Sequence, residues 1–463
     1  VPPSGRGFGS GSGGDHRNEK IAWIGVRVHR GRDFRAFRDL SSRPASGKKA
    51  INMTFSLLAS LALVAAPSEE RGLTAGWEGE TLRITGAPLE ARGPADRYAW
   101  VTLPAPGGVW DLSEHAKVEA EVTNTSGQAV DLLLWVVGDR GWDAVPAPAT
   151  LAPGETRLLS CDLRETWPDK TPKINPRLVK QVQMIILRRG NKPIMLSMRN
   201  LRATGEAPVW TMPTGRLEVP PVEDAVPAPG KRVRFRLPGQ EGSGVYSILH
   251  LPEDWKAGGT YPVIAEYPGN IFFIPGCYST GLPDQCLIGY GMTKGRGSIC
   301  VGMPFVDPVA GTIAEHGWGD PDATADHAVR MMEEVCAKYG GDRANLVLTG
   351  FSRGALACGY IGLRNDRIAA LWKGFHACQH YDGDGWNGAT MEGALERAKR
   401  FRGKAVFQTD NSPAQFQGVM DVMKTEVTWA NSGLGAHATA MFLDERESTS
   451  QLREWYLRLL STP

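Results

Sequence analysis

The pentapeptide Gly350-Phe-Ser-Arg-Gly354 constrains the fold of this 463-residue chain more than any other segment. An apolar run at 345–349 precedes it and a run of small and apolar residues at 355–361 follows it, which predicts a strand, a sharp turn and a helix. In such a turn the serine projects above a sheet, and the flanking glycines let neighbouring backbone approach closely. The helix that follows adds partial positive charge beside the serine. We therefore expect Ser352 to be a nucleophile.

A serine nucleophile needs a general base and a carboxylate that orients the base, and on this type of fold the chain order is serine, acid, histidine. His437 lies in a Gly-rich loop ahead of a predicted helix at 450–460, and we expect it to be the base. Asp410 ends a predicted strand between Ser352 and His437 and is the favoured acid. Asp382 and Asp384, which follow the preceding predicted strand, remain alternatives.

Two main-chain N–H groups are needed to stabilise the oxyanion of a tetrahedral intermediate. One is expected from Arg353, and the other from the loop after the third predicted strand, where Asn270 or Ile271 can donate. The candidate substrate-binding residues are Tyr267, Trp318, His380 and Trp386. No cofactor is expected, because no residues fall at metal-ligand spacing.

A family resemblance rests on Tyr267-Pro-Gly-Asn270, Trp318, the run Lys338-Tyr-Gly-Gly-Asp-Arg-Ala-Asn345, the pentapeptide and His437. With these residues the segment 231–463 resembles secreted α/β-hydrolase esterases of the polyhydroxybutyrate depolymerase, feruloyl esterase and acetyl xylan esterase type. The resemblance implies a mostly parallel sheet flanked by helices and hydrolysis of carboxylic esters through an acyl-enzyme. It does not fix the substrate, and the lack of an H-G-G-G motif leaves the second oxyanion donor open.

Short alternating runs separated by Gly, Pro and Asn turns predict an all-β sandwich over residues 73–208. The segments Gly108-Val-Trp-Asp-Leu-Ser113 and Leu151–Leu159 resemble parts of jelly-roll modules of the carbohydrate-binding type. Sugar binding and a spacer role are both open for this module. Its candidate stacking residues are Trp135, Trp142 and Trp167. The Pro-rich segment 209–230 is expected to be a semi-extended linker.

Before the predicted sandwich, charged, apolar and small residues follow one another in the order that is typical of a secretory signal peptide. Lys48 and Lys49 precede an apolar run that ends in small residues at Ala66, so 48–66 is a candidate signal peptide. Residues 1–47 are then either a basic disordered tail or a stretch that results from a translation start placed too far upstream. We expect a secreted or periplasmic protein that has no membrane contact after signal cleavage.

Export makes disulfides possible, but seven cysteines cannot all pair with one another. Cys277 and Cys286 lie close together in a Gly/Pro-rich loop and are the candidate pair. The chain has 52 Lys and Arg against 50 Asp and Glu, which argues against a nucleic-acid partner.

The favoured hypothesis is a serine carboxylesterase that cleaves acyl groups from polysaccharide, such as acetyl or feruloyl esters, or that cleaves a polyester. A prolyl-oligopeptidase-type serine peptidase is one alternative, because it would share the same turn. A non-catalytic sugar-binding protein with an inactive hydrolase domain is the other.

Overall fold

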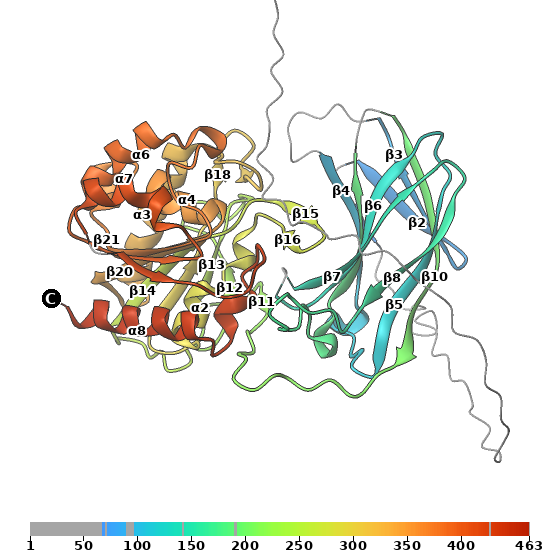
Figure 1. Ribbon diagram of the computed structural model, residues 1–463, viewed down its shortest axis with the longest axis horizontal. Coiled ribbons are helices and arrows are strands. Elements are labelled where there is room, and N and C mark those ends of the chain that lie inside the picture. Colours follow the sequence, from blue (N-terminus) through green and yellow to red (C-terminus); the bar gives the residue numbers. More distant parts are fainter. Residues whose placement is uncertain are drawn as a thin grey trace, which may run out of the picture. The chain divides into compact units, whose positions relative to one another are not determined.

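The computed structural model describes residues 67–69, 72–88, 97–140, 143–188, 192–425 and 427–462 (Figure 1). The expected tail 1–47, the expected signal peptide 48–66 and Trp142 lie outside these residues. All described residues belong to one structural unit. Within them, no helix is long and apolar enough to cross a membrane.

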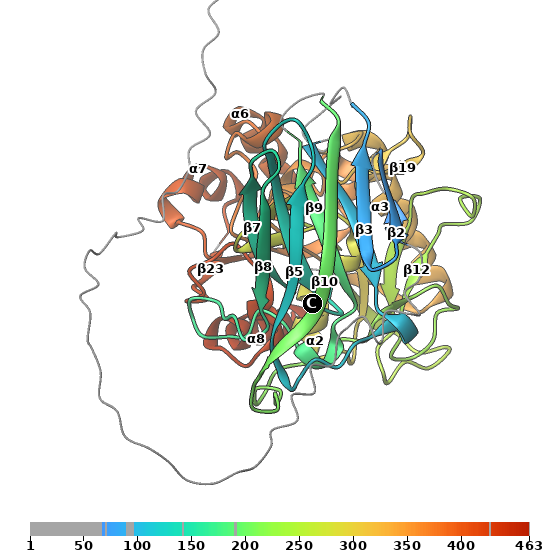
Figure 2. The same ribbon diagram turned by 90° about the vertical axis from the view of Figure 1, so that its right-hand side faces the viewer.

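Two five-stranded antiparallel sheets make up the first half of the described chain. The first sheet has the order β1 (Ser68–Glu69), β4 (Tyr98–Pro104), β9 (Gln181–Leu187), β6 (Val130–Val137) and β7 (Ala144–Leu151). The second has the order β2 (Leu73–Glu78), β3 (Thr81–Gly86), β10 (Ile194–Glu206), β5 (His115–Asn124) and β8 (Thr156–Asp162), and Figure 2 shows these strands side by side. Alternate residues of β5, Val118, Ala120 and Val122, are fully buried in a core shared by both sheets. The sheets form a sandwich, and its jelly-roll, carbohydrate-binding identity stays a prediction.

A nine-stranded mixed sheet makes up the second half. Its order is β11 (Val222–Glu223), β12 (Arg232–Phe235), β13 (Ser247–His250), β17 (Ile299–Gly302), β14 (Tyr261–Tyr267), β20 (Gly341–Phe351), β21 (Trp372–Cys378), β22 (Ala405–Thr409) and β23 (Val427–Ala430). The strands from β17 to β23 are parallel, while β13 runs antiparallel to both of its neighbours. The prediction of a mostly parallel sheet is therefore confirmed for this half.

Helices cover both faces of this sheet, because its central strands are apolar on both sides. One face carries α3 (Pro321–Lys338), α4 (Arg353–Tyr360), α5 (Asp366–Ala369), α6 (Met391–Ala398) and α7 (Pro413–Met423), and the other carries α2 (Ile288–Thr293) and α8 (Glu447–Ser461) (Figure 1). Along β14, Val263 and Ala265 belong to the core under α3 and α4, whereas Ile264 belongs to the core under α2 and α8. This is the α/β-hydrolase arrangement that the sequence predicts.

A hairpin of the second half packs against the first sheet of the sandwich. The hairpin consists of β15 (Phe272–Ile274) and β16 (Cys277–Ser279). The Phe273 ring lies 5.2 Å from that of Tyr98 and 5.7 Å from that of Trp100, in edge-to-face contacts. The Tyr278 hydroxyl donates a 2.7 Å hydrogen bond to Oε1 of Gln183. One apolar core therefore runs from the second half into the sandwich.

This packing covers two of the candidate stacking residues. Trp135 and Trp167 are only 1% and 4% exposed, and the Trp135 ring lies 5.1 Å from that of Tyr278. Neither offers an exposed platform to a polysaccharide chain, so the stacking prediction is wrong for these two. The segment 209–230 is also held in place, since the Leu217 N–H donates to the carbonyl of Leu443 at 2.7 Å.

We predict that Phe273→Ala lowers the free energy of unfolding by about 3 to 5 kcal/mol, because it empties a buried site between the sandwich and the second half. Phe273 is 3% exposed, whereas its neighbour Phe272 on the same strand is 37% exposed. Phe272→Ala is the matched control and should cost less than about 1 kcal/mol. Denaturant unfolding of the two variants tests this, and equal losses would contradict it.

Candidate active site

Ser352 lies between the end of β20 and the start of α4, in a backbone conformation that only a tight turn imposes. Its φ is 55° and its ψ is −119°, which few residues other than glycine adopt. A Cβ on Gly350 would lie 2.1 Å from the carbonyl oxygen of Gly354, and a Cβ on Gly354 would lie 1.9 Å from that of Tyr267. Both glycines are therefore required by close backbone contacts, as the pentapeptide predicts.

His437 lies within hydrogen-bond distance of the serine. Its Nε2 is 2.9 Å from Oγ of Ser352, so the hydroxyl can donate to a neutral imidazole. The ring packs on Phe351 with 4.6 Å between centroids. Burial, with a smaller contribution from the charge that His380 can carry, lowers the pKa of His437 to about 3. His437 is therefore neutral at physiological pH, and its Nε2 lone pair is free to accept the hydrogen bond from the serine hydroxyl.

Asp410 holds the loop that carries the histidine, but no hydrogen bond joins its carboxylate to His437 among the described residues. The carboxylate accepts from the Ser432 N–H at 2.7 Å, from the Ser432 hydroxyl at 2.6 Å and from Nε2 of Gln379 at 3.1 Å. Gln379 also donates to the carbonyl of Ala436 at 2.9 Å, next to His437. Asp410 is thus brought to the histidine loop rather than to the imidazole.

The two alternative acids have other partners. Asp382 accepts two hydrogen bonds of 2.7 Å from the guanidinium of Arg397. Asp384 lies 2.7 Å from Nδ1 of His380, and the His380 ring lies 5.5 Å from that of His437. Of the two, only Asp384 reaches the surroundings of the serine, and it does so through a second histidine.

The side chain of Arg353 gathers the loops around the site. The guanidinium is 1% exposed and donates to the carbonyls of Ala314 at 3.0 Å, Gly317 at 2.9 Å, Gly269 at 2.9 Å and Gly281 at 2.9 Å. Burial lowers its pKa to about 9, so it stays charged at neutral pH. The sequence pointed only to the main-chain N–H of this residue. Nothing in its local pattern shows that the side chain turns inward.

The main-chain hydrogen bonds show which of the candidate oxyanion donors still have a free N–H group. The Ile271 N–H already donates to the carbonyl of Glu315 at 2.9 Å, so its prediction as a donor is wrong. The Asn270 N–H donates to no group in the part of the chain that the structure describes, and its side-chain Oδ1 is fixed by the Gly317 N–H at 3.0 Å. Arg353 opens α4, where an N–H has no partner within the helix. Asn270 and Arg353 remain as the candidate pair.

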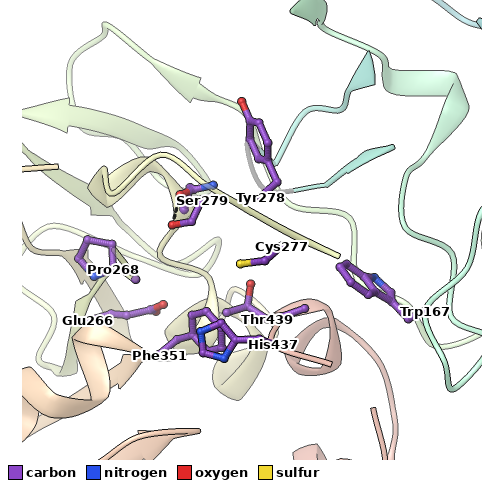
Figure 3. Close-up of a pocket in the computed structure, with 12 residues that line it drawn as sticks. Trp167, Glu266, Pro268, Cys277, Tyr278, Ser279, Phe351, His437 and Thr439 are labelled. Carbon is purple, nitrogen blue, oxygen red and sulfur yellow. Dashed lines mark hydrogen bonds between the residues drawn. The ribbon is translucent and has the colours of Figure 1, made fainter. Parts of the chain in front are cut away.

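A pocket beside His437 is formed jointly by the two halves (Figure 3). Trp167 of the sandwich and Glu266 of β14 lie at its two ends, with Cys277, His437 and Thr439 between them. Trp167 came from the sandwich prediction and was not expected at the active site.

Glu266 is a buried carboxylate that the sequence did not single out. It accepts from the N–H groups of Leu287 at 2.9 Å and Gly289 at 3.0 Å, at the start of α2. Burial raises its pKa to about 7 against the effect of these hydrogen bonds. It caps a helix at the pocket wall, as an acidic group at a helix N-terminus should.

The predicted substrate-binding residues do not share one location. Tyr267 is fully buried and is not among the residues that line the pocket beside His437, so the structure does not support a role for it in substrate binding. Trp318 is also buried and its indole donates to the carbonyl of Asn387 at 2.8 Å, so it supports the fold instead. Trp386 is half-buried, with its ring 5.2 Å from that of Trp318. Only His380 lies next to the serine and histidine pair.

The predicted disulfide is absent, since Cys277 and Cys286 are both free thiols. Their loop is closed instead by Oε1 of Gln285, which accepts from the Thr280 N–H at 2.7 Å and hydroxyl at 3.0 Å. The Cys286 thiol donates to the carbonyl of Glu266 at 3.3 Å. Burial raises the pKa of Cys277 to about 12, which disfavours the thiolate that oxidation requires. Across the described ranges, no group of acidic, His and Cys side chains could hold a metal ion.

We predict that Arg353→Lys lowers the free energy of unfolding by about 3 kcal/mol or more, because one ammonium cannot reach four carbonyls on separate loops. Arg364→Lys is the matched control, since Arg364 pairs at 2.8 Å with an exposed Asp322 and should lose less than about 1 kcal/mol. Chemical denaturation measures both losses. Similar losses would show that the four hydrogen bonds contribute little.

We predict that the imidazole of His437 does not titrate between about pH 5 and pH 8, because burial disfavours its protonated form. Histidine-labelled protein and NMR chemical shifts test this, with His437→Gln to assign the resonance. A midpoint near the ordinary pKa of about 6.5 would mean that a carboxylate reaches His437 in solution.

No protein-family model matches the sequence, and no curated protein matches it. Several solved structures are similar to parts of the chain. A variant of the isopeptidase AtxE2 with a bound astexin peptide is 13% identical, covers 85% of this chain and 56% of its own, and gives a TM-score of 0.38.

Two esterases are similar to parts of the chain at comparable sequence identities and TM-scores. An esterase of Rhizomucor miehei is 11% identical over 50% of this chain and 82% of its own, with a TM-score of 0.35. The thermophilic esterase Est2 of the planctomycete Thermogutta terrifontis is 15% identical over 49% of this chain and 97% of its own, with a TM-score of 0.32. These neighbours are hydrolases, but every TM-score is below 0.5, so the likenesses decide neither the fold nor the activity of this chain.

Proposed function

We propose that this chain is a serine hydrolase that cleaves carboxylic esters through an acyl-enzyme. The observation that carries the proposal is the 2.9 Å separation between Oγ of Ser352 and Nε2 of His437, on a strained turn at the end of a parallel strand. A nucleophile and a neutral base in hydrogen-bond contact are the parts that acyl transfer requires.

In the proposed reaction, Oγ of Ser352 attacks the ester carbonyl carbon while Nε2 of His437 takes the hydroxyl proton. The N–H groups of Arg353 and Asn270 stabilise the negative charge on the carbonyl oxygen. The tetrahedral intermediate collapses when His437 gives its proton to the leaving alcohol oxygen, and the acyl group stays on the serine. Water, activated by His437, then releases the acid and restores the serine.

Asp410 acts in this proposal as a positioning residue. Its carboxylate fixes Ser432, and Gln379 joins it to the carbonyl before His437. These bonds hold the imidazole against the serine without a carboxylate on Nδ1. The low pKa of His437 agrees with such a site, because an adjacent carboxylate would raise it.

The proposed substrates are acyl esters on polysaccharide, such as acetyl or feruloyl groups, or a polyester, and the proposed location is secreted or periplasmic. The attached sandwich is what supports a polysaccharide. Two of its candidate stacking residues are buried, so binding of a long sugar chain on that face has lost its support. The ester chemistry does not depend on it.

We predict that the full chain hydrolyses p-nitrophenyl acetate and that Ser352→Ala lowers kcat/KM by about 10⁴-fold or more. Ser461→Ala, at the exposed end of α8, is the control that should keep full activity. Full activity in Ser352→Ala would overturn the proposal. Faster turnover of peptides than of esters would favour the peptidase alternative, and a folded protein with no hydrolysis would favour the non-catalytic one.

A further inference from the structure

We propose that Trp167 of the sandwich selects the alcohol portion of the substrate. Its indole N–H donates a hydrogen bond to an oxygen atom of that alcohol, so the enzyme prefers esters of oxygen-bearing alcohols, such as polyols and sugars, over esters of plain alkyl alcohols. This inference rests on the proposed ester hydrolysis and adds the residue that would recognise the alcohol portion of the substrate.

The indole N–H of Trp167 is a buried donor that has no acceptor. The side chain is 4% exposed, and Nε1 forms no hydrogen bond with any residue that the structure describes. The same side chain lines the pocket that His437 and Thr439 also line (Figure 3). A buried unpaired donor costs free energy, and an acceptor on a bound ligand removes that cost.

Two interactions fix Trp167 and the loop that carries it. Nζ of Lys173 lies 5.0 Å from the ring centroid, in a cation–π contact. Asp169, two residues after Trp167, forms a 2.7 Å ion pair with Arg446, which also donates to the carbonyl of Ser432 at 3.0 Å. Ser432 belongs to the loop that carries the histidine. The sandwich loop and the histidine loop are therefore tied together, and the position of the indole is set before substrate binds.

The position of Trp167 assigns it to the alcohol side of the ester. His437 must give its proton to the leaving oxygen, so the alcohol lies beside the imidazole. Ala438 and Thr439, which follow His437 directly, line the pocket together with Trp167. Tyr278 and Phe351 add two aromatic rings to the same lining.

The chemistry of this pocket sets the expected selectivity. A further oxygen atom of a bound alcohol accepts a hydrogen bond from the indole N–H of Trp167, whereas a plain alkyl alcohol leaves this N–H buried without an acceptor. A site built to hydrogen-bond an oxygen rejects an analogue without it far more strongly than an apolar site rejects a missing methylene. The sandwich, for which the sequence left sugar binding and a spacer role open, would then recognise a sugar or polyol inside the candidate active site and not on an exposed face.

Trp167→Phe tests the proposal, because it removes the N–H and keeps an aromatic ring. Trp135→Phe is the matched control, since Trp135 is 1% exposed and has an equally unpartnered indole N–H in the same contact region, but does not line the pocket. Glyceryl triacetate and n-butyl acetate serve as substrates that share the acyl group and differ in the oxygens of the alcohol.

We expect Trp167→Phe to lower kcat/KM for glyceryl triacetate by about 10- to 100-fold and for n-butyl acetate by less than about 3-fold. Trp135→Phe should change either value by less than about 3-fold. Thermal stability of Trp167→Phe should not fall below that of Trp135→Phe, because both variants lose an unsatisfied donor. Equal losses on both substrates, or no loss on glyceryl triacetate, would overturn the inference.

A binding measurement separates this inference from the proposed function. Calorimetry with the Ser352→Ala variant should detect binding of glyceryl triacetate. In the double variant that also carries Trp167→Phe, the Kd for glyceryl triacetate should be about 10-fold higher or more. Ester hydrolysis by the wild type with an unchanged Kd in the double variant overturns the inference alone. Absence of ester hydrolysis with a Trp167-dependent Kd overturns the proposed function and keeps the binding site.

Discussion

The buried guanidinium of Arg353 is the interaction on which the candidate site depends. It stands next to Ser352 and donates to four main-chain carbonyls, two on the loop before α3 and two on the loops that flank the β15–β16 hairpin. A buried charge is costly unless its hydrogen bonds are satisfied, and here carbonyl dipoles satisfy them without a carboxylate. The turn that strains Ser352 and the loops that shape its surroundings are thereby joined through one side chain.

The β15–β16 hairpin, whose flanking loops accept hydrogen bonds from Arg353, makes the contact with the sandwich. Phe273 and Tyr278 dock on aromatic and polar side chains of the first sheet, so a single apolar core spans both halves. The sandwich for this reason contributes to the wall of the candidate active site, and the segment that joins it to the second half is held by contacts on that half. Trp167 enters the pocket through that arrangement, and the ion pair between Asp169 and Arg446 keeps it there.

Several features could be predicted because they depend on residues close together in the chain. The strand, turn and helix around Ser352 follow from apolar periodicity and two glycines, and the structure has all three. The loop of His437 follows the last strand of the sheet, where parallel topology places it beside the serine. Ile271 as an oxyanion donor and the pairing of Cys277 failed, because main-chain hydrogen bonds and thiol surroundings depend on distant loops.

The sequence by itself determined the α/β architecture, the strained turn and the residue types of the site, because periodicity and spacing act over a few residues. Only the tertiary structure decided which groups the side chains of the site contact. Asp410 binds the histidine loop and not the imidazole, Arg353 turns its side chain inward, and Trp167 crosses from the sandwich to the pocket. Each of these contacts joins segments that are tens of residues or more apart, so packing of the whole unit sets them and no local pattern records them.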